Sequence, residues 1–313
     1  MAANLTQDVR EEIKRLYAKL GNKTEVARIL GVHRDTVIRH TLYAPQQAVS
    51  YPTVVEESYC PQTYDFGLQY RRVAALFDLH HPFHDIKAID ACVAFLRSWK
   101  PDLIVLPGDY MDFYPLSRFP KSPARDHSLQ DEIDSFLTTK KKIETIGCEL
   151  KLVDGNHDHR LFRHIQDHPS LYKLRALEIP RLLELSSQWQ HYRNQSRLKV
   201  GRLIIHHGDL VGRGVSGKYP AKMMLDKMRV TNMFGHLHKE EISRVTEYNG
   251  EVTSSYAVGH MCDLNQVDYV ANPNWQQGFA TIELDEHGYE NVTFRHVVHG
   301  QIYYEGKSYG LPQ

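Results

Sequence analysis

The middle of the sequence alternates between short apolar runs and longer amphipathic segments. The runs VAALF (73–77), DLIVLP (102–107) and LKLV (150–153) have the length of buried strands. The two segments between them, 88–99 and 132–146, carry apolar residues at helical spacing. Strands that alternate with helices pair in parallel and are covered on both faces. This alternation predicts an α/β fold built on a largely parallel sheet.

Later apolar runs follow one another more closely, so we expect antiparallel pairs among them. These runs are 198–205, 230–234, 252–258, 279–284, 291–298 and 301–306. Polar residues that bind metals in proteins follow five strands of the whole set. They are Asp78 and His80, Asp109 and Asp112, Asn156 and His157, His206 and His207, and His236 and His238. Because open α/β sheets bind ligands at the carboxyl ends of their strands, we expect all five groups to converge in one crevice.

The residue types in these groups favour a metal site. Asp, Asn and His without Cys offer oxygen and nitrogen donors, which suit Mn, Fe, Co or Zn. The Asp-x-His and His-x-His spacings place two side chains on the same side of an extended segment. A carboxylate such as Asp109 is able to bridge two cations about 3.5 to 4 Å apart, the spacing of two-metal hydrolytic sites. Any one group alone would be an ordinary turn or a satisfied core residue, so the prediction depends on all five together.

Composition restricts the partners and the compartment. Lys and Arg together number 38, as do Asp and Glu, so the formal net charge is zero and nucleic-acid binding must come from local patches. The four cysteines form no CxxC pair, which argues against a disulfide framework and a thiolate zinc site. The apolar runs are too short to span a bilayer, and the opening residues MAANLTQDVREE lack the apolar region of a signal peptide. We therefore expect a cytoplasmic protein without a membrane partner.

The start of the chain predicts a separate helical unit. Residues 5–20 place apolar side chains on one face of a helix. Residues 23–40 contain two further short helical patterns separated by Gly31, and they resemble a helix-turn-helix. That resemblance implies that Arg34 and Arg39 contact DNA. A role in dimerisation or docking is the alternative, because short three-helix units also serve those purposes.

Three segments are expected along the chain. A helix-turn-helix-like domain covers 1–43, and a linker in which Pro, Gln and Ser interrupt any regular period covers 44–70. The large domain with the five polar groups covers 71–313.

The five polar groups occur within ordered motifs. They read DLH at 78–80, GDYMD at 108–112, GNHD at 155–158, HHG at 206–208 and GHLH at 235–238. In this order they resemble the motifs DxH, GDxxD, GNH followed by an acid, His before Gly, and GHxH of the calcineurin-like metallophosphoesterases. The resemblance covers roughly residues 72 to 300. It implies an αββα sandwich of two mixed sheets flanked by helices, to which the small all-α domain is added at the N-terminus.

The resemblance also implies ligands for two divalent metal ions. Manganese is the expected metal, with iron, zinc, cobalt and nickel as alternatives. One ion would be held by Asp78, His80, Asp109 and His238, and the other by Asp109, Asn156, His207 and His236. His206 is an alternative to its neighbour His207. His157 would face the substrate as a catalytic residue, oriented by Asp112.

The implied chemistry is hydrolysis of a phosphate ester by a metal-activated water, without a covalent enzyme intermediate. DNA is the preferred substrate, because a helix-turn-helix ahead of such a domain resembles phage and bacterial proteins described as DNA phosphoesterases. Arg118 and Lys121, in the loop after Asp112, would then bind flanking phosphates, although that loop is equally typical of a solvated surface.

Two other functions compete with a DNA phosphoesterase. The first is a small-molecule phosphodiesterase or phosphatase, acting on a cyclic nucleotide or similar ester, with the N-terminal domain used for assembly. The second is a DNA-binding regulator with an inactive phosphoesterase scaffold, which the complete ligand set argues against. The sequence leaves the oligomeric state open, a dimer included.

Overall fold

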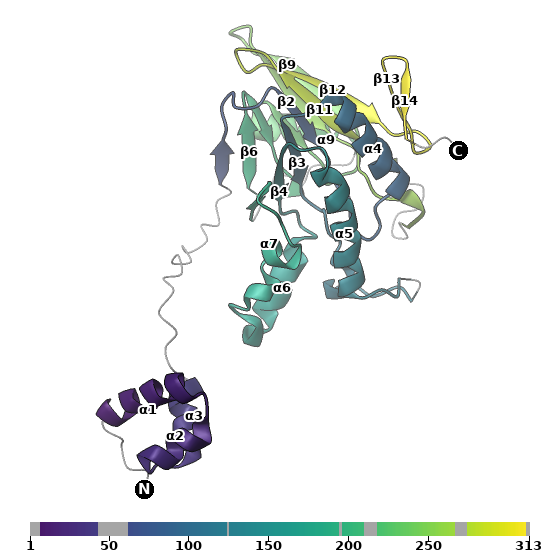
Figure 1. Ribbon diagram of the computed structural model, residues 1–313. Coiled ribbons are helices and arrows are strands. Elements are labelled where there is room, and N and C mark those ends of the chain that lie inside the picture. Colours follow the sequence, from purple (N-terminus) through teal and green to yellow (C-terminus); the bar gives the residue numbers. More distant parts are fainter. Residues whose placement is uncertain are drawn as a thin grey trace. The chain divides into compact units, whose positions relative to one another are not determined.

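The computed structural model describes residues 7–42, 62–123, 125–193, 196–209, 218–266 and 274–310 (Figure 1). The chain divides into two compact units, Met1–Tyr59, which we call the head, and Cys60–Gln313, which we call the body. Each unit has a hydrophobic core of its own. Within these ranges, every helix is too short or too polar to cross a membrane.

Three short helices form the head: α1 (Gln7–Leu20), α2 (Lys23–Leu30) and α3 (Arg34–Leu42). Asn22 caps α2, because its side chain accepts hydrogen bonds from the backbone N–H groups of Thr24 and Glu25 at 3.0 and 3.3 Å. Gly31 ends α2 with a left-handed backbone (φ 64°), which glycine adopts without strain. The small core consists of Ile13, Val26, Ala27 and Val37. DNA contact by this three-helix unit stays a prediction.

Two mixed sheets form the centre of the described part of the body. The first has the strand order β12–β11–β2–β3–β4–β5, in which β2 to β5 are parallel and β11 and β12 antiparallel. Its strands are β2 (Arg72–Ala75), β3 (Leu103–Pro107), β4 (Glu149–Val153), β5 (Trp189–Tyr192), β11 (Gly278–Leu284) and β12 (Glu290–His296). The second has the order β1–β6–β7–β8–β10–β9. Its strands are β1 (Thr63–Asp65), β6 (Arg197–Val200), β7 (Leu203–Ile205), β8 (Asn232–Phe234), β9 (Glu241–Thr246) and β10 (Val252–Ala257).

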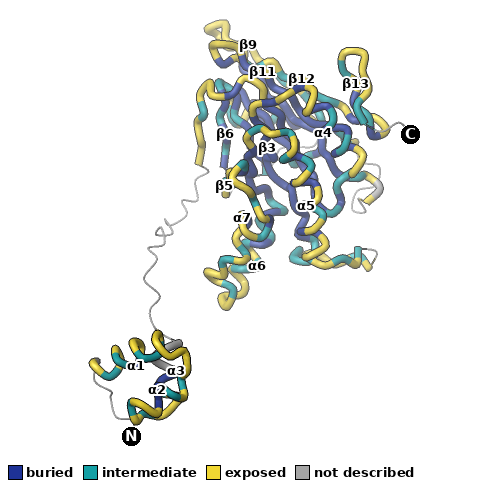
Figure 2. Tube along the Cα trace, viewed as in Figure 1, coloured by how far each residue is buried: buried dark blue, intermediate teal, exposed yellow. Residues whose placement is uncertain are grey.

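Helices cover the outer faces of both sheets. Helices α4 (Ile86–Trp99) and α5 (Leu129–Glu144) pack on the first sheet, where Phe95 and Phe136 are fully buried. Helix α9 (Pro220–Met228) packs on the second sheet, with Met224 near Phe234. The apolar faces of the two sheets meet between these layers, and Figure 2 shows the central strands as mostly buried. The predicted αββα sandwich is therefore confirmed.

The remaining elements lie between and after the sheet strands. They are α6 (His159–Asp167), α7 (Ile179–Leu182), a hairpin of β13 (Ile302–Tyr304) and β14 (Lys307–Tyr309), and single 3₁₀ turns at Tyr114–Leu116, Pro169–Leu171, Arg175–Leu177 and Leu264–Gln266.

Several strands differ from the prediction. The run 198–205 is a hairpin, because Gly201 has a left-handed backbone (φ 57°) and β6 turns back antiparallel to β7. Strands β1, β5, β9 and β14 were not predicted, since short or edge strands are held by backbone pairing and leave no apolar run. Strand β1 pairs with β6, so residues 62–70 of the expected linker belong to the body. Residues 43–61 lie outside the described ranges.

Backbone pairing continues past the ends of the central strands and places the polar loops side by side. The N–H of His80 donates to the carbonyl of Asp109 at 2.8 Å, and the N–H of His81 donates to the carbonyl of Tyr110 at 3.1 Å. In the second sheet, the N–H of Gly235 donates to the carbonyl of His207 at 3.0 Å. The loops after β2 and β3, and those after β7 and β8, are thereby fixed to each other.

A buried acid supports the loop after β3. Glu132, in the first turn of α5, has no exposed surface, and its Oε1 lies 2.9 Å from the backbone N of Tyr114 and 2.8 Å from His127 Nε2. Its Oε2 has no hydrogen-bond partner among the described residues. Burial, with the nearby charge of Asp112 adding to it, raises the pKa of the Glu132 carboxyl to about 8.

We predict that Glu132→Gln reduces the pH dependence of stability. The folded state holds the Glu132 proton more tightly than the unfolded chain, so this group stabilises the fold at low pH. That contribution is lost as the pH rises from about 4.5 through about 8. Tm is measured by thermal unfolding at a series of pH values across this window. It should fall less with rising pH for the variant than for wild type. Glu247→Gln, at an exposed carboxyl, is the control, and equal slopes for wild type and Glu132→Gln would contradict the prediction.

Candidate functional site

Several of the predicted ligand residues have an unusual backbone. The residues Asp78, His80, Asp109, His236 and His238 have φ of 54°, 52°, 49°, 66° and 57°, which lies in the left-handed region. Such a conformation costs a non-glycine residue about 1–3 kcal/mol and persists only where the surroundings impose it. Residues of this kind cluster at functional sites, and these five follow β2, β3 and β8.

One cluster of side chains consists of Asp78, His80 and His238. Each offers one ligand atom, and these atoms lie within 4.8 Å of one another. His80 Nε2 is 3.2 Å from His238 Nε2, which in turn is 3.6 Å from Asp78 Oδ1. All three residues are buried, and Asp78 Oδ1 has no hydrogen-bond partner among the described residues. A buried carboxylate oxygen facing two imidazole nitrogens fits a cation between them.

A second cluster contains Asp109, His207 and His236, whose ligand atoms also lie within 4.8 Å of one another. His207 Nε2 is 3.3 Å from Asp109 Oδ2 and 3.0 Å from Asn156 Oδ1. Asp109 Oδ2 is also 3.8 Å from His80 Nε2 in the first cluster. The carboxylate of Asp109 therefore stands between the two clusters, as a shared ligand would.

The charges of these groups suit a divalent cation. Burial alone would raise the pKa of Asp109, but His207 and His157 hold it well below its usual value. Burial would likewise raise the pKa of Asp78, and His238 and His207 lower it. Burial lowers the pKa of His238, which leaves its ring neutral and able to donate a lone pair. Burial would lower the pKa of His207, but Asp109 raises it to about 10, so this ring holds a proton that a bound metal would displace.

The rings of the adjacent residues His206 and His207 lie in different surroundings. The ring of His206 stacks on Phe234, with ring centroids 5.8 Å apart, and burial lowers its pKa to about 3. The ring of His207 lies beside Asp109 and Asn156, so His207 faces the clusters.

Next to the clusters, Asp112 connects three side chains. Its Oδ2 is 3.0 Å from His157 Nδ1 and 3.2 Å from His80 Nδ1, while its Oδ1 accepts a hydrogen bond from Arg160 Nη1 at 2.7 Å. His157 Nε2 is 3.9 Å from Asp109 Oδ2. Burial would raise the pKa of Asp112, but His157 and His80 hold it well below its usual value. The predicted catalytic pair therefore lies against the carboxylate shared by the two clusters.

The two acids that flank the GNH motif hold the loops in place. Asp158 accepts hydrogen bonds from the backbone N–H groups of Asp109, Met111 and Gly155 at 2.7, 2.9 and 2.7 Å. Asp154 Oδ1 accepts a hydrogen bond from the Tyr110 hydroxyl at 2.7 Å and lies 2.7 Å from His191 Nε2.

The four predicted nucleic-acid contacts have different surroundings. Arg34 is exposed at the start of α3, and the side chain of Arg39 lies outside the described part. Arg118 forms an ion pair with Asp167. Lys121 donates to the backbone carbonyls of Tyr114 and Ser117, and its Nζ lies 4.8 Å from the centre of the Tyr114 ring.

Some neighbours of the site were not predicted from the sequence. Arg160, the second residue of α6, follows His157 by three residues, and its backbone N–H donates to the His157 carbonyl at 2.9 Å, so this spacing was a usable signal. His260 follows β10 as part of a Gly-His pair, like His236 after β8, and its ring centre is 5.1 Å from that of His238. The ring of Trp275 lies 4.3 Å from that of His238, and no motif in the sequence indicated it.

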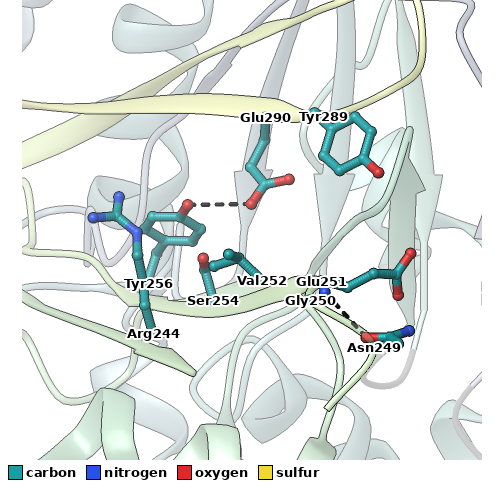
Figure 3. Close-up of a pocket in the computed structure, with 9 residues that line it drawn as sticks. All are labelled: Arg244, Asn249, Gly250, Glu251, Val252, Ser254, Tyr256, Tyr289 and Glu290. Atoms are coloured by element: carbon teal, nitrogen blue, oxygen red, sulfur yellow. Dashed lines mark hydrogen bonds between the residues drawn. The ribbon is translucent and has the colours of Figure 1, made fainter. Parts of the chain in front are cut away.

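A separate pocket lies between the β9–β10 hairpin and the turn that leads into β12 (Figure 3). It has a volume of about 450 Å³ and is lined by Arg244, Tyr256 and Glu290 among others, with the Tyr256 hydroxyl donating to Glu290 at 3.2 Å. None of its lining residues belongs to the metal clusters.

We predict that Gly155→Ala reduces metal binding. A Cβ at Gly155 would lie 2.4 Å from Asp109 Oδ1 and 2.5 Å from the Asp109 backbone nitrogen, so Asp109 must move. Manganese bound per chain, measured by equilibrium dialysis on protein whose fold is checked by circular dichroism, should fall. Gly250→Ala is the control for general destabilisation, because a Cβ there has nothing within 4 Å and its cost comes only from the left-handed backbone (φ 84°). Undiminished manganese binding by folded Gly155→Ala would show that the close approach is unimportant.

The chain is similar to phage proteins and to solved structures. The Gene 54 protein of Mycobacterium phage L5 is 25% identical over 228 residues, which cover 69% of this chain and 89% of that protein. The Gene 54 protein of Mycobacterium phage D29 gives the same identity and coverage. A single mutant of Vps29 from Entamoeba histolytica matches with 13% identity and a TM-score of 0.42, over 77% of this chain and 99% of that one. A dimetal phosphatase from Danio rerio matches with 12% identity and a TM-score of 0.39, over 72% of this chain and 96% of that one.

The family profile named "Calcineurin-like phosphoesterase" matches residues 71–270, which is more than half of the chain. This range contains all five motifs and both clusters. The chain belongs to the calcineurin-like phosphoesterase family.

Proposed function

We propose that this protein is a two-metal phosphodiesterase that acts on nucleic acid. One observation carries the proposal: Asp109 Oδ2 lies 3.3 Å from His207, 3.8 Å from His80 and 3.9 Å from His157. One carboxylate oxygen thus meets both ligand clusters and the predicted catalytic histidine. An inactive scaffold would have no need to keep this complete set together.

The residues fit two divalent cations, with manganese the expected metal. Asp78, His80, Asp109 and His238 would hold one ion, and Asp109, Asn156, His207 and His236 the other. When bound, two such ions lower the pKa of a coordinated water and neutralise charge on phosphoryl oxygens. The orphaned Asp78 Oδ1 supports this assignment, because a buried carboxylate oxygen without a partner is costly.

The residues beside the ions would orient the substrate. His157 is 17% exposed at its side chain and faces the cluster, so it is placed to contact a phosphoryl group. Asp112 fixes the ring by its contact with Nδ1, and Nε2 lies on the opposite side of the ring, 3.1 Å from Arg160 Nη2. A group held in position in this way adds about 10² to 10⁴-fold where it takes part in proton transfer.

The preference for nucleic acid depends on the head. Arg34 is exposed on the third helix of a small three-helix unit whose turn at Gly31 suits a helix-turn-helix. One observation favours a small-molecule phosphodiester instead. Arg118 and Lys121, the cations expected at the rim, are engaged with Asp167 and with backbone carbonyls of their own loop.

We predict that Asp109→Asn removes activity and metal together. An amide bridges two cations poorly, so hydrolysis should fall about 10²-fold or more, and at least one manganese should be lost. The assay is Mn-dependent hydrolysis of bis-p-nitrophenyl phosphate beside labelled single- and double-stranded DNA, with metal content measured on the same samples. Asp126→Asn, at an exposed carboxyl of the rim loop, is the control.

The outcomes separate the candidate functions. Retained turnover with full metal content in Asp109→Asn would refute a shared carboxylate. Cleavage of DNA by the wild type supports a nuclease, and turnover of the aryl diester alone supports a small-molecule phosphodiesterase.

We predict that Arg34→Ala with Arg39→Ala weakens DNA binding and leaves hydrolysis of the aryl diester unchanged. Each lost phosphate contact should reduce the slope of log affinity against log salt by about 1. Lys14→Ala with Lys19→Ala, which removes the same charge from exposed positions of α1, is the control. Equal DNA affinity of both double variants, measured by fluorescence anisotropy at several salt concentrations, would assign the head another role.

A further inference from the structure

Arg160 occupies a position that no motif assigned. It is the second residue of α6, and its side chain is 15% exposed. Its Nη1 donates to Asp112 Oδ1 at 2.7 Å and to the Asp112 carbonyl at 2.8 Å. Its Nη2 lies 3.1 Å from His157 Nε2. The guanidinium is therefore held against both members of the predicted catalytic pair.

The contact with His157 fixes what each side chain presents. A guanidinium only donates hydrogen bonds, so His157 Nε2 accepts from Arg160 and His157 Nδ1 carries the proton shared with Asp112. Because His157 Nε2 accepts this hydrogen bond, Arg160 rather than His157 offers hydrogen-bond donors on this side of the clusters.

Arg160 also has donors to spare. A guanidinium has five N–H groups, and the contacts with Asp112 and His157 use three of them. The others have no partner within the described ranges. Burial, and after it the charge of Arg160, lowers the pKa of Lys121, so a second cation lies close by. Asp112 is the one carboxylate in contact with Arg160 among the described residues, and it is shared with His80 and His157, so an anionic substrate would give the guanidinium a second partner.

We propose that Arg160 is a substrate-contacting residue that binds a non-bridging oxygen of the phosphoryl group. On substrate binding, its Nη2 exchanges the hydrogen bond with His157 Nε2 for one with the phosphoryl oxygen, while Asp112 keeps hold of Nη1. Arginine suits this role, because its planar fork pairs with phosphate oxygens and its charge is permanent. The inference rests on the proposed phosphodiesterase function, since it assigns the phosphoryl group to this side of the clusters.

Binding of inorganic phosphate tests the contact without requiring turnover. Calorimetry with manganese present should give a Kd about tenfold higher or more for Arg160→Gln than for wild type. Arg160→Lys, which keeps the charge without the fork, should lie between them. Arg163→Gln, at an exposed arginine of the same helix, is the matched control and should bind as wild type does. Equal phosphate affinity of Arg160→Gln and wild type, or no binding by wild type, would overturn the proposal.

Leaving-group dependence separates a substrate contact from support of His157. Methyl p-nitrophenyl phosphate has a good leaving group and methyl phenyl phosphate a poorer one. A residue that binds a non-bridging oxygen should lower kcat/KM equally for both esters, by about 10²-fold for Arg160→Gln. If Arg160 acts only by holding His157, the fall in kcat/KM for Arg160→Gln will depend on the leaving group in the same way as the fall for His157→Gln. The double variant Arg160→Gln with His157→Gln will then be no slower than His157→Gln alone.

The two arms also distinguish this proposal from the proposed function. If wild type hydrolyses neither ester but binds phosphate in a manner that depends on Arg160, the phosphodiesterase assignment fails and the contact stands. If both esters are hydrolysed and Arg160→Gln is as fast as wild type, the phosphodiesterase assignment stands and the contact is wrong.

Discussion

The carboxyl group of Asp158 makes the contacts on which the rest of the site depends. It accepts three backbone N–H groups, from Asp109, Met111 and Gly155, and so joins the loop after β3 to the loop after β4. Leaving a buried N–H without a partner costs about 1–3 kcal/mol. These bonds therefore hold Asp109 in its left-handed conformation (φ 49°), which by itself is unfavourable. The shared carboxylate is positioned by an acid that has no place in the proposed ligand sets.

The same region of the body concentrates unfavourable features that a bound cation would compensate. Asp78 and Asp109 are buried and ionised, because neighbouring histidines lower the pKa of each despite burial. Asp78 Oδ1 has no hydrogen-bond partner among the described residues, and His238 Nε2 and His80 Nε2 face each other at 3.2 Å. Two imidazole nitrogens this close share at most one proton, so a common cation explains the approach better than a hydrogen bond. The two hydrophobic clusters of the sandwich supply the stability that offsets these unfavourable features.

A site residue could be predicted from the sequence where it lies at the end of a buried parallel strand. Asp78, Asp109 and Asn156 follow β2, β3 and β4, whose carboxyl ends share one edge, so their convergence could be predicted from the strand pattern alone. The strand pattern could not decide between His206 and His207, because adjacent side chains after a strand point to opposite sides and both residues are histidines. Edge strands such as β9 left no apolar signal, since most of its side chains are exposed. Arg160 was missed because it lies on a helix, where a charged residue is usually a solvated one.

Asp112 shows why the metal centre and the substrate side are best regarded as one unit. Its Oδ2 contacts the Nδ1 atoms of both His80 and His157, while its Oδ1 binds Arg160. Contact with Nδ1 leaves Nε2 of His80 facing the cluster, as an outer partner of a metal-bound histidine does. The same carboxylate orients the predicted catalytic ring and the guanidinium beside it. A movement of Asp112 would therefore alter a proposed ligand, the predicted catalytic residue and the proposed phosphate contact at once. This coupling gives a physical reason for an acid at the last position of GDYMD, since no other side chain accepts from three partners in these directions.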